Sequence, residues 1–447
     1  MQVRYGHRNY ARIQRLFAFA IVLLLLSSSA KAVLFTGYTL QSVSNTALAP
    51  GLDLWEYSLQ GLNDPTFAQR LHVLEVDTHQ SGDLQLILAS KNGQIHGLQK
   101  TTDTMAWLAT ERRDLRVLAA INGDFFDMSA GGPLGLTMQA GRLMMTSEFP
   151  QGWTFGLTAD GQARIGQPRV QLRFSAARDG QEVLRDIQID ALNCLRADIA
   201  PYQSTPNNAW QARQDNKLVL YTHDYYRSTM ALDGGYEVRL DVAGDILPNQ
   251  TLQANVSGIH GTGKVTLAGS DQVPQGTALS QGTMVLSATD DAIATLRQLK
   301  KGDVVSIDCV MSPDWADVVT CLGGGRPDGG PLLVRDGQIQ PDDLLVEDYQ
   351  YFYTANPRTM AGIRRDGSYF FLVTDGYTPG AANGLTVQQL ARIALDLGAN
   401  IALNLDGGPS STMALREGDA FAVILNSAGG RRLETAVGNS LVFCERR

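Results

Sequence analysis

One segment near the C-terminus constrains the fold of this 447-residue chain more than any other. The apolar run Tyr369–Thr374 ends in Asp375-Gly376, and the apolar run Ile401–Leu405 ends in Asp406-Gly407-Gly408. Between them, Thr386 and Gln389 form the capping-box pattern that begins a helix. The apolar stripe of this helix consists of Leu390, Ile393, Ala394 and Leu397, and Gly398 is its stop. Strand, helix and strand at this spacing predict a right-handed β-α-β unit with parallel strands.

Both aspartates of this unit would leave the same edge of the sheet, where open α/β sheets bind ligands. Parallel strands lie about 4.8 Å apart, so adjacent strands, or strands with one between them, would place the two carboxylates roughly 5–10 Å apart. That range includes the spacings of retaining and of inverting glycosidases, so the stereochemical outcome stays open. Asp-Gly after a strand is also good turn chemistry, which is the alternative for each aspartate alone. The paired placement favours a site.

The rest of the chain contains both helix-type and strand-type patterns, and the sequence therefore predicts an α/β (mixed α+β) fold. We expect a mixed β-sheet core in which the C-terminal β-α-β unit carries the site. Short β-type runs separated by Asp-Gly and Asn-Gly turns predict a β-rich middle segment at about 160–290. The predicted division is a signal peptide at 1–32, an N-terminal β-rich lead-in at 33–114 and a catalytic domain at 115–447.

The first 32 residues have the anatomy of a secretory signal peptide. Four arginines precede the apolar stretch Leu16–Leu26, and Ala30-Lys31-Ala32 has the form of a cleavage site. The stretch is short for a membrane span, and an uncleaved amphipathic anchor is the alternative. We therefore expect an exported protein, periplasmic or secreted, without stable membrane insertion after cleavage.

Charge and histidine content exclude two classes of function. Without the leader the chain has 32 basic and 45 acidic residues, a net charge of −13. Nucleic acid is a poor partner for so acidic a chain, because its phosphates require a basic surface. The six histidines form no H-x-H or H-E-x-x-H pair, so we expect no metal or other cofactor.

The four cysteines allow more than one interpretation. Cys309 and Cys321 lie in two apolar runs separated by a turn-like Ser-Pro-Asp, and a hairpin would bring them close enough to bridge. Cys194 and Cys444 would then be the remaining pair. Four cysteines allow three connectivities, and free buried thiols are the alternative.

The stretch around the second aspartate resembles a known family. Residues 404–412, Asn-Leu-Asp-Gly-Gly-Pro-Ser-Ser-Thr, are similar to the N-L-D-G-G-x-S-S-T signature of the phosphodiester glycosidase family. Other similar segments follow in the family's order: Ile121–Phe126, Gly323–Gly325 with Leu333–Gly337, Asn356–Gly362, Asp375 to Thr386, and Glu434 to Asn439. Met360 departs from the family, which usually has Ala there. The resemblance spans roughly residues 115–445 and is loose over 160–290.

The resemblance implies hydrolysis of the bond between an anomeric sugar carbon and a phosphodiester oxygen, as by a phosphodiester α-N-acetylglucosaminidase. The expected substrate is a glycosyl phosphodiester of a bacterial surface or extracellular glycan. Its leaving group would be a phosphate monoester, whose second pKa is about 6. Arg358 is the natural partner of that phosphate, because a guanidinium fork binds two oxygens at once. A structural salt bridge is the alternative for Arg358.

Three carboxylates are candidates for catalysis. The oxocarbenium-like sugar needs a carboxylate as nucleophile or as base for water, and Asp406 is the first choice, followed by Asp375. Asp124 follows an Asn-Gly turn and suits either carboxylate role. A cap of a helix or turn is the alternative for this residue.

The expected substrate-binding residues are Arg358, Asn122, Asn404, Gly407, Gly408, Ser410 and Glu434. Asn122 would bond sugar hydroxyls or only hold a left-handed turn. Gly407, Gly408 and the glycines at 323–325 allow close backbone approach, and their N–H groups are suited to cradle phosphate, with Arg326 beside them. A solvated surface role is the alternative for Glu434.

Two rival functions remain. Ser410 or Ser411 would be the nucleophile of an acyl hydrolase, but the elbow pattern G-x-S-x-G is absent. A non-catalytic glycan-binding or exopolysaccharide-associated protein on the same fold is the second rival. Asp406→Asn discriminates, because it should abolish turnover in an enzyme and leave much of the affinity of a binder.

Overall fold

The protein is built mainly from β-strands in the part of the chain that the computed structural model describes. That part comprises residues 33–128, 131–148, 152–197, 216–231, 235–261, 276–324, 332–340, 353–426 and 434–447, so the predicted signal peptide lies outside it. Strands account for 51% and helices for 10%. The predicted α/β fold was therefore wrong. Within the described residues, the named strands pair antiparallel, apart from one short parallel pair.

The first sheet carries the segment that the sequence singled out. Its order is β1-β2-β3-β22-β21-β23-β19-β20. The bounds are β1 (Tyr38–Ala49), β2 (Leu52–Gly61), β3 (Ala68–Val76), β22 (Tyr369–Thr374), β21 (Thr359–Arg364), β23 (Ala399–Asn404), β19 (Leu332–Arg335) and β20 (Gln338–Ile339). Helix α6 (Val387–Asp396) joins β22 to β23 and has the predicted capping box.

The error in the fold class has a specific cause in this sheet. β22 and β23 run in the same direction, but β21 lies between them and pairs antiparallel with each. The local pattern of strand, helix and strand carried no information about a third strand arriving from earlier in the chain. The same holds for β3, which pairs antiparallel with the other side of β22.

Two five-stranded sheets pack beside the first. The second sheet contains β25 (Ala420–Asn426), β24 (Thr412–Glu417), β5 (Leu115–Asn122), β26 (Asn439–Arg446) and β4 (Leu84–Ser90), in that order. The third contains β7 (Arg142–Met145), β6 (Thr137–Gln139), β18 (Val318–Gly323), β8 (Thr154–Thr158) and β9 (Ala163–Gly166). Phe371 of the first sheet contacts Phe155 of the third and Phe443 of the second edge-on, at ring-centroid distances of 5.1 and 5.5 Å. One apolar core therefore fixes the three sheets against one another.

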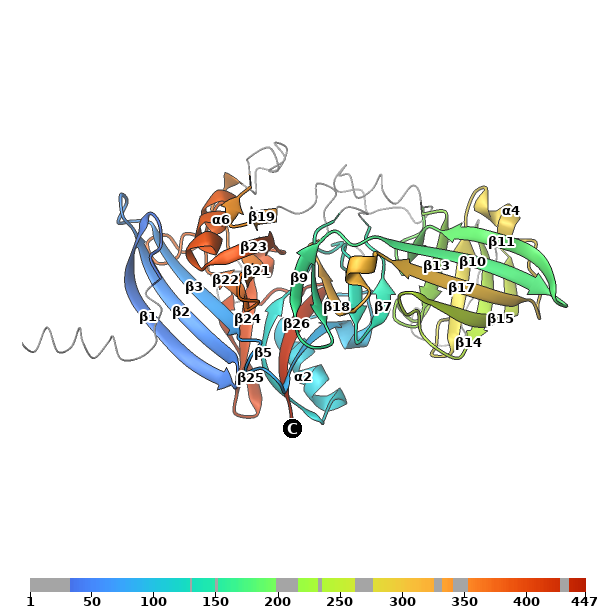
Figure 1. Ribbon diagram of the computed structural model, residues 1–447, viewed down its shortest axis with the longest axis horizontal. Helices are drawn as coiled ribbons and strands as arrows, with labels where there is room; N and C mark the ends of the chain where they lie inside the picture. Colours follow the sequence, from blue (N-terminus) through green and yellow to red (C-terminus); the bar gives the residue numbers. More distant parts are fainter. Residues whose placement is uncertain are drawn as a thin grey trace, which may run out of the picture.

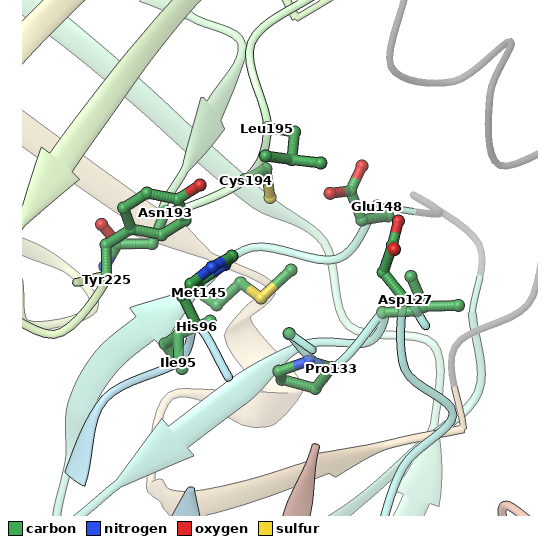
Figure 2. Close-up of a pocket in the computed structure, with 12 residues that line it drawn as sticks. Ile95, His96, Asp127, Pro133, Met145, Glu148, Asn193, Cys194, Leu195 and Tyr225 are labelled. Atoms are coloured by element: carbon green, nitrogen blue, oxygen red, sulfur yellow. The ribbon is translucent and has the colours of Figure 1, made fainter. Parts of the chain in front are cut away.

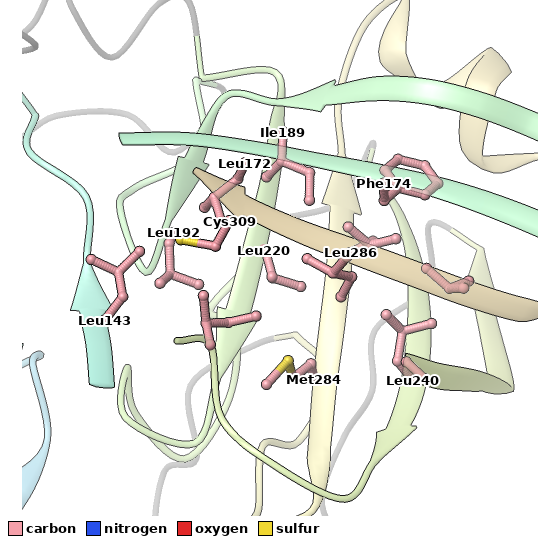
Figure 3. Packing of buried hydrophobic residues seen from close by; sticks show 14 of the residues in the cluster. Leu143, Leu172, Phe174, Ile189, Leu192, Leu220, Leu240, Met284, Leu286 and Cys309 are labelled. Carbon is pink, nitrogen blue, oxygen red and sulfur yellow. The ribbon is translucent and has the colours of Figure 1, made fainter. Parts of the chain in front are cut away.

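The middle of the chain forms a separate sheet, whose apolar core also includes Met138 and Cys321 of the third sheet. Its strands, in order, are β11 (Gln181–Ile189), β10 (Val170–Arg178), β17 (Val304–Met311), β15 (Gln250–Gly261), β14 (Tyr236–Val242), β16 (Thr283–Ala288), β13 (Leu218–Thr222) and β12 (Ala191–Leu192). Figure 3 shows Phe174, Leu220 and Leu286 packed inside this sheet. The sheet lies at the opposite end of the molecule from β1 (Figure 1).

Helices are few among the described residues. Helix α2 (Thr101–Glu111) covers the second sheet, α4 (Ala292–Leu296) packs on the middle sheet, and α6 covers one face of the first sheet. Short 3-10 turns are η1 (Lys91–Gly93), η2 (Pro313–Trp315) and η4 (Gly408–Ser410). None of the described helices is long and apolar enough to span a membrane.

All four cysteines are free and buried. The Cys309–Cys321 bridge is absent because β17 and β18 are not a hairpin: they belong to different sheets, with η2 between them. The alternative of free buried thiols is the one observed.

Candidate active site

Asp375, Arg358 and Asp406 lie at the same end of three neighbouring strands in the middle of the first sheet. Asp375 follows β22, Asp406 comes soon after β23, and Arg358 directly precedes β21. Backbone hydrogen bonds continue past the strand ends, from Thr374 N to Arg358 O (2.8 Å) and from Leu405 N to Thr359 O (2.9 Å). Because β21 is the middle strand, the backbone of Arg358 lies between the two strands that lead to the aspartates, which are about 10 Å apart.

Pro357 holds the loops after β22 and β23 together. Gly408 N donates to Pro357 O at 2.8 Å. A Cβ on Gly376 would lie 2.7 Å from Pro357 Cδ, and one on Gly407 would lie 3.1 Å from Pro357 O. Glycine at position 376 is therefore required by close backbone approach, and the loop that carries Asp375 is fixed against the segment that carries Arg358.

Asp406 is half-buried, and its own loop orients its carboxylate. Oδ1 accepts a hydrogen bond from Gly407 N at 2.9 Å, and the main-chain N–H of Asp406 donates to Gly123 O at 3.2 Å. The second contact joins the first sheet to the loop after β5. Asp375 is also half-buried, and its Oδ1 accepts from Gly376 N at 3.2 Å.

Asn122 connects three segments of the site from inside the protein. Its Nδ2 donates to Asp406 O at 2.7 Å, and its Oδ1 accepts from Thr359 Oγ1 at 2.8 Å and from Thr412 N at 3.0 Å. The residue is 0% exposed. These contacts give Asn122 a bracing role that neither interpretation of its sequence position included.

Asp124 is placed close behind Asp406. It is 1% exposed, its N–H donates to Asn439 Oδ1 at 2.8 Å, and its Oδ2 accepts from Gly135 N at 2.6 Å. A Cβ on Gly135 would lie 2.6 Å from Gly323 Cα, so these segments touch without space for a side chain.

Arg358 is a buried cation held by main-chain carbonyl groups. It is 5% exposed; Nε donates to Leu385 O at 2.8 Å and Nη2 donates to Thr354 O at 3.0 Å. Burial lowers the pKa of Arg358 to about 10, against a smaller opposite effect of Tyr377. The guanidinium therefore keeps its charge at neutral pH.

Tyr377 and Asn356 also lie at this site, although the sequence did not predict them as site residues. The Tyr377 hydroxyl donates to Asn356 Oδ1 at 2.9 Å, and it would lie 3.4 Å from a Cβ on Gly408. Tyr377 has a φ of 57°, a conformation that costs energy for a bulky residue and that occurs most often at functional sites. No sequence pattern indicates a left-handed tyrosine, so only the structure finds it.

The remaining predicted residues have mainly internal contacts. Gly407 and Gly408 donate their N–H groups within the protein, as described, and Asn404 Nδ2 donates to Leu405 O at 2.8 Å. Ser410 is buried in η4. Glu434 accepts from Thr102 N at 2.8 Å and Thr102 Oγ1 at 2.6 Å, at the start of α2. Gly325 and Arg326 lie outside the described residues.

A small cavity lies near the loop after β5, away from this site (Figure 2). It has a volume of about 20 Å³, room for about one water molecule. Its walls include His96, Asn193 and Tyr225 on one side and Asp127 and Glu148 on the other. Burial lowers the pKa of His96. None of the predicted site residues lines this cavity. Within the described residues, no group of three or more His, Cys, Asp and Glu side chains is arranged to hold a metal ion.

Comparisons with solved structures show a shared fold. A hypothetical protein from Synechocystis is 18% identical with a TM-score of 0.61, over 92% of this chain and 68% of that one. A protein from Burkholderia pseudomallei K96243, provisionally named as exported, is 17% identical with a TM-score of 0.63, over 93% of this chain and 98% of that one. No curated protein matches the chain.

The sequence comparison with family models is more specific. Residues 250–444 match the phosphodiester glycosidase family. This confirms the resemblance, and the matched range contains Arg358, Asp375 and Asp406. The zebrafish N-acetylglucosamine-1-phosphodiester α-N-acetylglucosaminidase catalytic domain, auto-inhibited by its pro-peptide, is 14% identical with a TM-score of 0.43, over 92% of this chain and 89% of that one. Asn122 and Asp124 lie before the part matched to the phosphodiester glycosidase family.

Proposed function

We propose that this protein is an exported hydrolase that cleaves the sugar–phosphate bond of a glycosyl phosphodiester and releases free sugar and a phosphomonoester. The match to the family indicates an activity of the phosphodiester glycosidase type. The observation that carries the proposal is the shared end of three neighbouring strands, where the middle strand carries a buried arginine and each outer strand leads into a half-buried aspartate. A leaving phosphate needs a cation and a developing sugar cation needs a carboxylate, and this end of the sheet supplies both.

Arg358 is assigned to the phosphate. The bond between C1 and its oxygen breaks, and the electron pair leaves with the phosphate oxygen. A cation beside that oxygen stabilises the developing charge, because preorganised charges act strongly where water is excluded. The backbone of Gly407 and Gly408 is less suited to this role, since both N–H groups already donate to Asp406 Oδ1 and Pro357 O.

Asp406 and Asp375 are assigned to the sugar. One carboxylate acts as the base that takes a proton from the attacking water, whose hydroxyl ends on C1. Alternatively it acts as nucleophile at C1, and water then breaks the bond between C1 and the carboxylate and releases the free sugar. Asp406 is the first choice because its loop holds one carboxylate oxygen and its backbone is tied to the Asn122–Asp124 segment. Asp124 is a third, buried carboxylate, next in sequence to Gly123, whose carbonyl accepts from Asp406 N.

The substrate we propose is an α-N-acetylglucosaminyl phosphodiester, or a related unit of a bacterial surface or extracellular glycan. The leader pattern at 1–32 supports an exported location, periplasmic or secreted. The net negative charge of the chain would repel a phosphate-containing substrate. It therefore supports recognition of the phosphate by a local cation and not by the overall charge of the protein.

The test incubates the protein and Asp406→Asn with an α-N-acetylglucosaminyl phosphodiester and with UDP-N-acetylglucosamine. NMR follows free sugar, its first-formed anomer and the phosphomonoester. Asp179→Asn, an exposed turn residue, is the matched control. We expect free sugar from the wild type and from Asp179→Asn, and a loss of at least about 100-fold in Asp406→Asn. Binding of these compounds without turnover in any variant would favour the glycan-binding alternative.

A further inference from the structure

Strand β3 brings two charged or titratable residues to the edge that carries Asp375. In the pairing of β3 with β22, His72 lies opposite Val373, and Asp375 N donates to Arg70 O at 3.2 Å. Val373 and Leu74 both face the core between the sheets, so alternation along each strand puts His72 and Asp375 on that same face. They are diagonal neighbours across the pair, a separation that an imidazole ring spans.

His72 is buried against a second acid from the next strand. It is 8% exposed, and Glu56 lies opposite it in the pairing of β2 with β3. His72 Nδ1 lies 3.2 Å from Glu56 Oε1, an ion-pair distance, although the angle is outside that of a hydrogen bond. The imidazole therefore stands between Glu56 of β2 and Asp375 after β22.

The groups around His72 act in opposite directions on its pKa. Burial lowers the pKa of His72, Glu56 and Asp375 raise it, and Arg70 lowers it, with a net lowering. His72 is consequently neutral at neutral pH and gains its proton in acid. In acid the imidazolium would place a positive charge between the Glu56 and Asp375 carboxylates.

We propose that His72 is a positioning residue for Asp375, and that the row Glu56–His72–Asp375 links the candidate active site to the partly exposed Glu56 of β2. The inference rests on the proposed function for its catalytic consequence. It extends the site into the N-terminal strands, outside the range matched to the family. Its structural part, the coupling of His72 to Asp375, is testable without any substrate.

The first experiment measures the pKa of His72 by NMR, with carbon-13 in the histidine rings, in the wild type, Asp375→Asn and Glu56→Gln. Each substitution removes a negative charge that raises the pKa of His72, so we expect a lower value in both variants. The exposed His79 serves as the internal reference, which should not move. An unchanged His72 in Asp375→Asn, with a shift in Glu56→Gln, would assign His72 to Glu56 alone and overturn the proposal.

The second experiment compares the pH profiles of kcat/KM for the wild type, His72→Gln and His79→Gln. Glutamine gains no proton in acid, so the change in kcat/KM that follows the charge of His72 should be absent and the acid limb of His72→Gln should shift. A shift of about half a pH unit changes kcat/KM on that limb about threefold. The neutral-pH KM and the profile of His79→Gln should stay as in the wild type. Loss of activity at all pH values without a shift of the limb would indicate a merely structural role. Absence of hydrolysis in the wild type would contradict the proposed function, and the NMR result would still decide the coupling.

Discussion

The side chain of Asn122 donates a 2.7 Å hydrogen bond to the main-chain carbonyl of Asp406, 284 residues later in the chain. The same side chain accepts from Thr359 and Thr412. One buried amide thus fixes the end of β5 to β21, to β24 and to the loop after β23. The position of the Asp406 carboxylate depends on this junction between two sheets.

Asn122→Ala should therefore reduce both stability and activity. The substitution removes three hydrogen bonds and leaves buried partners without them, at a cost of about 2–4 kcal/mol in the free energy of unfolding. Urea denaturation measures this loss, and the NMR assay measures the accompanying fall in turnover. Asn63→Ala, in an exposed turn, should leave both near wild type. A variant with normal stability would show that the junction does not depend on Asn122.

Arg358 should give the activity an alkaline limit. Its pKa is lowered to about 10, so its charge is present at neutral pH and is lost as the pH rises through that value. We expect kcat/KM to fall above about pH 9 while circular dichroism still reports folded protein. A profile that stays flat to pH 11 in folded protein would contradict a role for this cation.

Arg358→Lys tests the fork geometry separately from the charge. Lysine keeps a cation but cannot bind two phosphate oxygens at once, so kcat/KM should fall at least about tenfold. Arg365→Lys is the matched control, because Arg365 is exposed. Equal activity of the two variants would mean that only charge at position 358 matters.

Gly376→Ala should displace the loop that carries Asp375. The new Cβ would lie 2.7 Å from Pro357 Cδ, so the loop or the proline must shift. Overpacking of this kind costs about 1–3 kcal/mol, and the shift should lower kcat more than it raises KM. Gly82→Ala, where nothing lies within 4 Å of the added Cβ, should be neutral in the same urea and activity assays.

The cysteines should resist a thiol reagent in the native protein. Burial raises the pKa of Cys309 and of Cys444 to about 12 and raises that of Cys321, so thiolate is scarce at pH 8. Dithiobis(nitrobenzoate) should label all four thiols in guanidinium chloride and few or none before unfolding. Detection of fewer than four thiols after unfolding would reveal a disulfide.

Local patterns in the sequence predicted local structure well. The capping box at Thr386 and Gln389, the apolar stripe of α6 and the strands on either side of it are all present, because each depends on neighbours in sequence. The placement of aspartates after two apolar strands led to Asp375 and Asp406, and the motif resemblance led to Arg358. These inferences needed only strand direction and the chemistry of side chains.

The arrangement of strands was decided by tertiary structure. β21 enters between β22 and β23, and β3 adds to β22 from far earlier in the chain. The α/β prediction failed because no local pattern reports which distant strand completes a sheet. The bracing contacts of Asn122 and the place of Glu434 at the start of α2 are likewise set by distant partners.

The sequence by itself determined which residue types stand at the strand ends and where the amphipathic helix α6 lies. Those properties follow from periodicity and from turn chemistry, which act over a few residues. Only the tertiary structure decided that the strand after Arg358 lies between the strands that lead to the aspartates, that Tyr377 adopts a left-handed conformation and that His72 is a diagonal neighbour of Asp375. Each of these depends on packing between segments that are distant in sequence, where burial and long-range hydrogen bonds outweigh local preference.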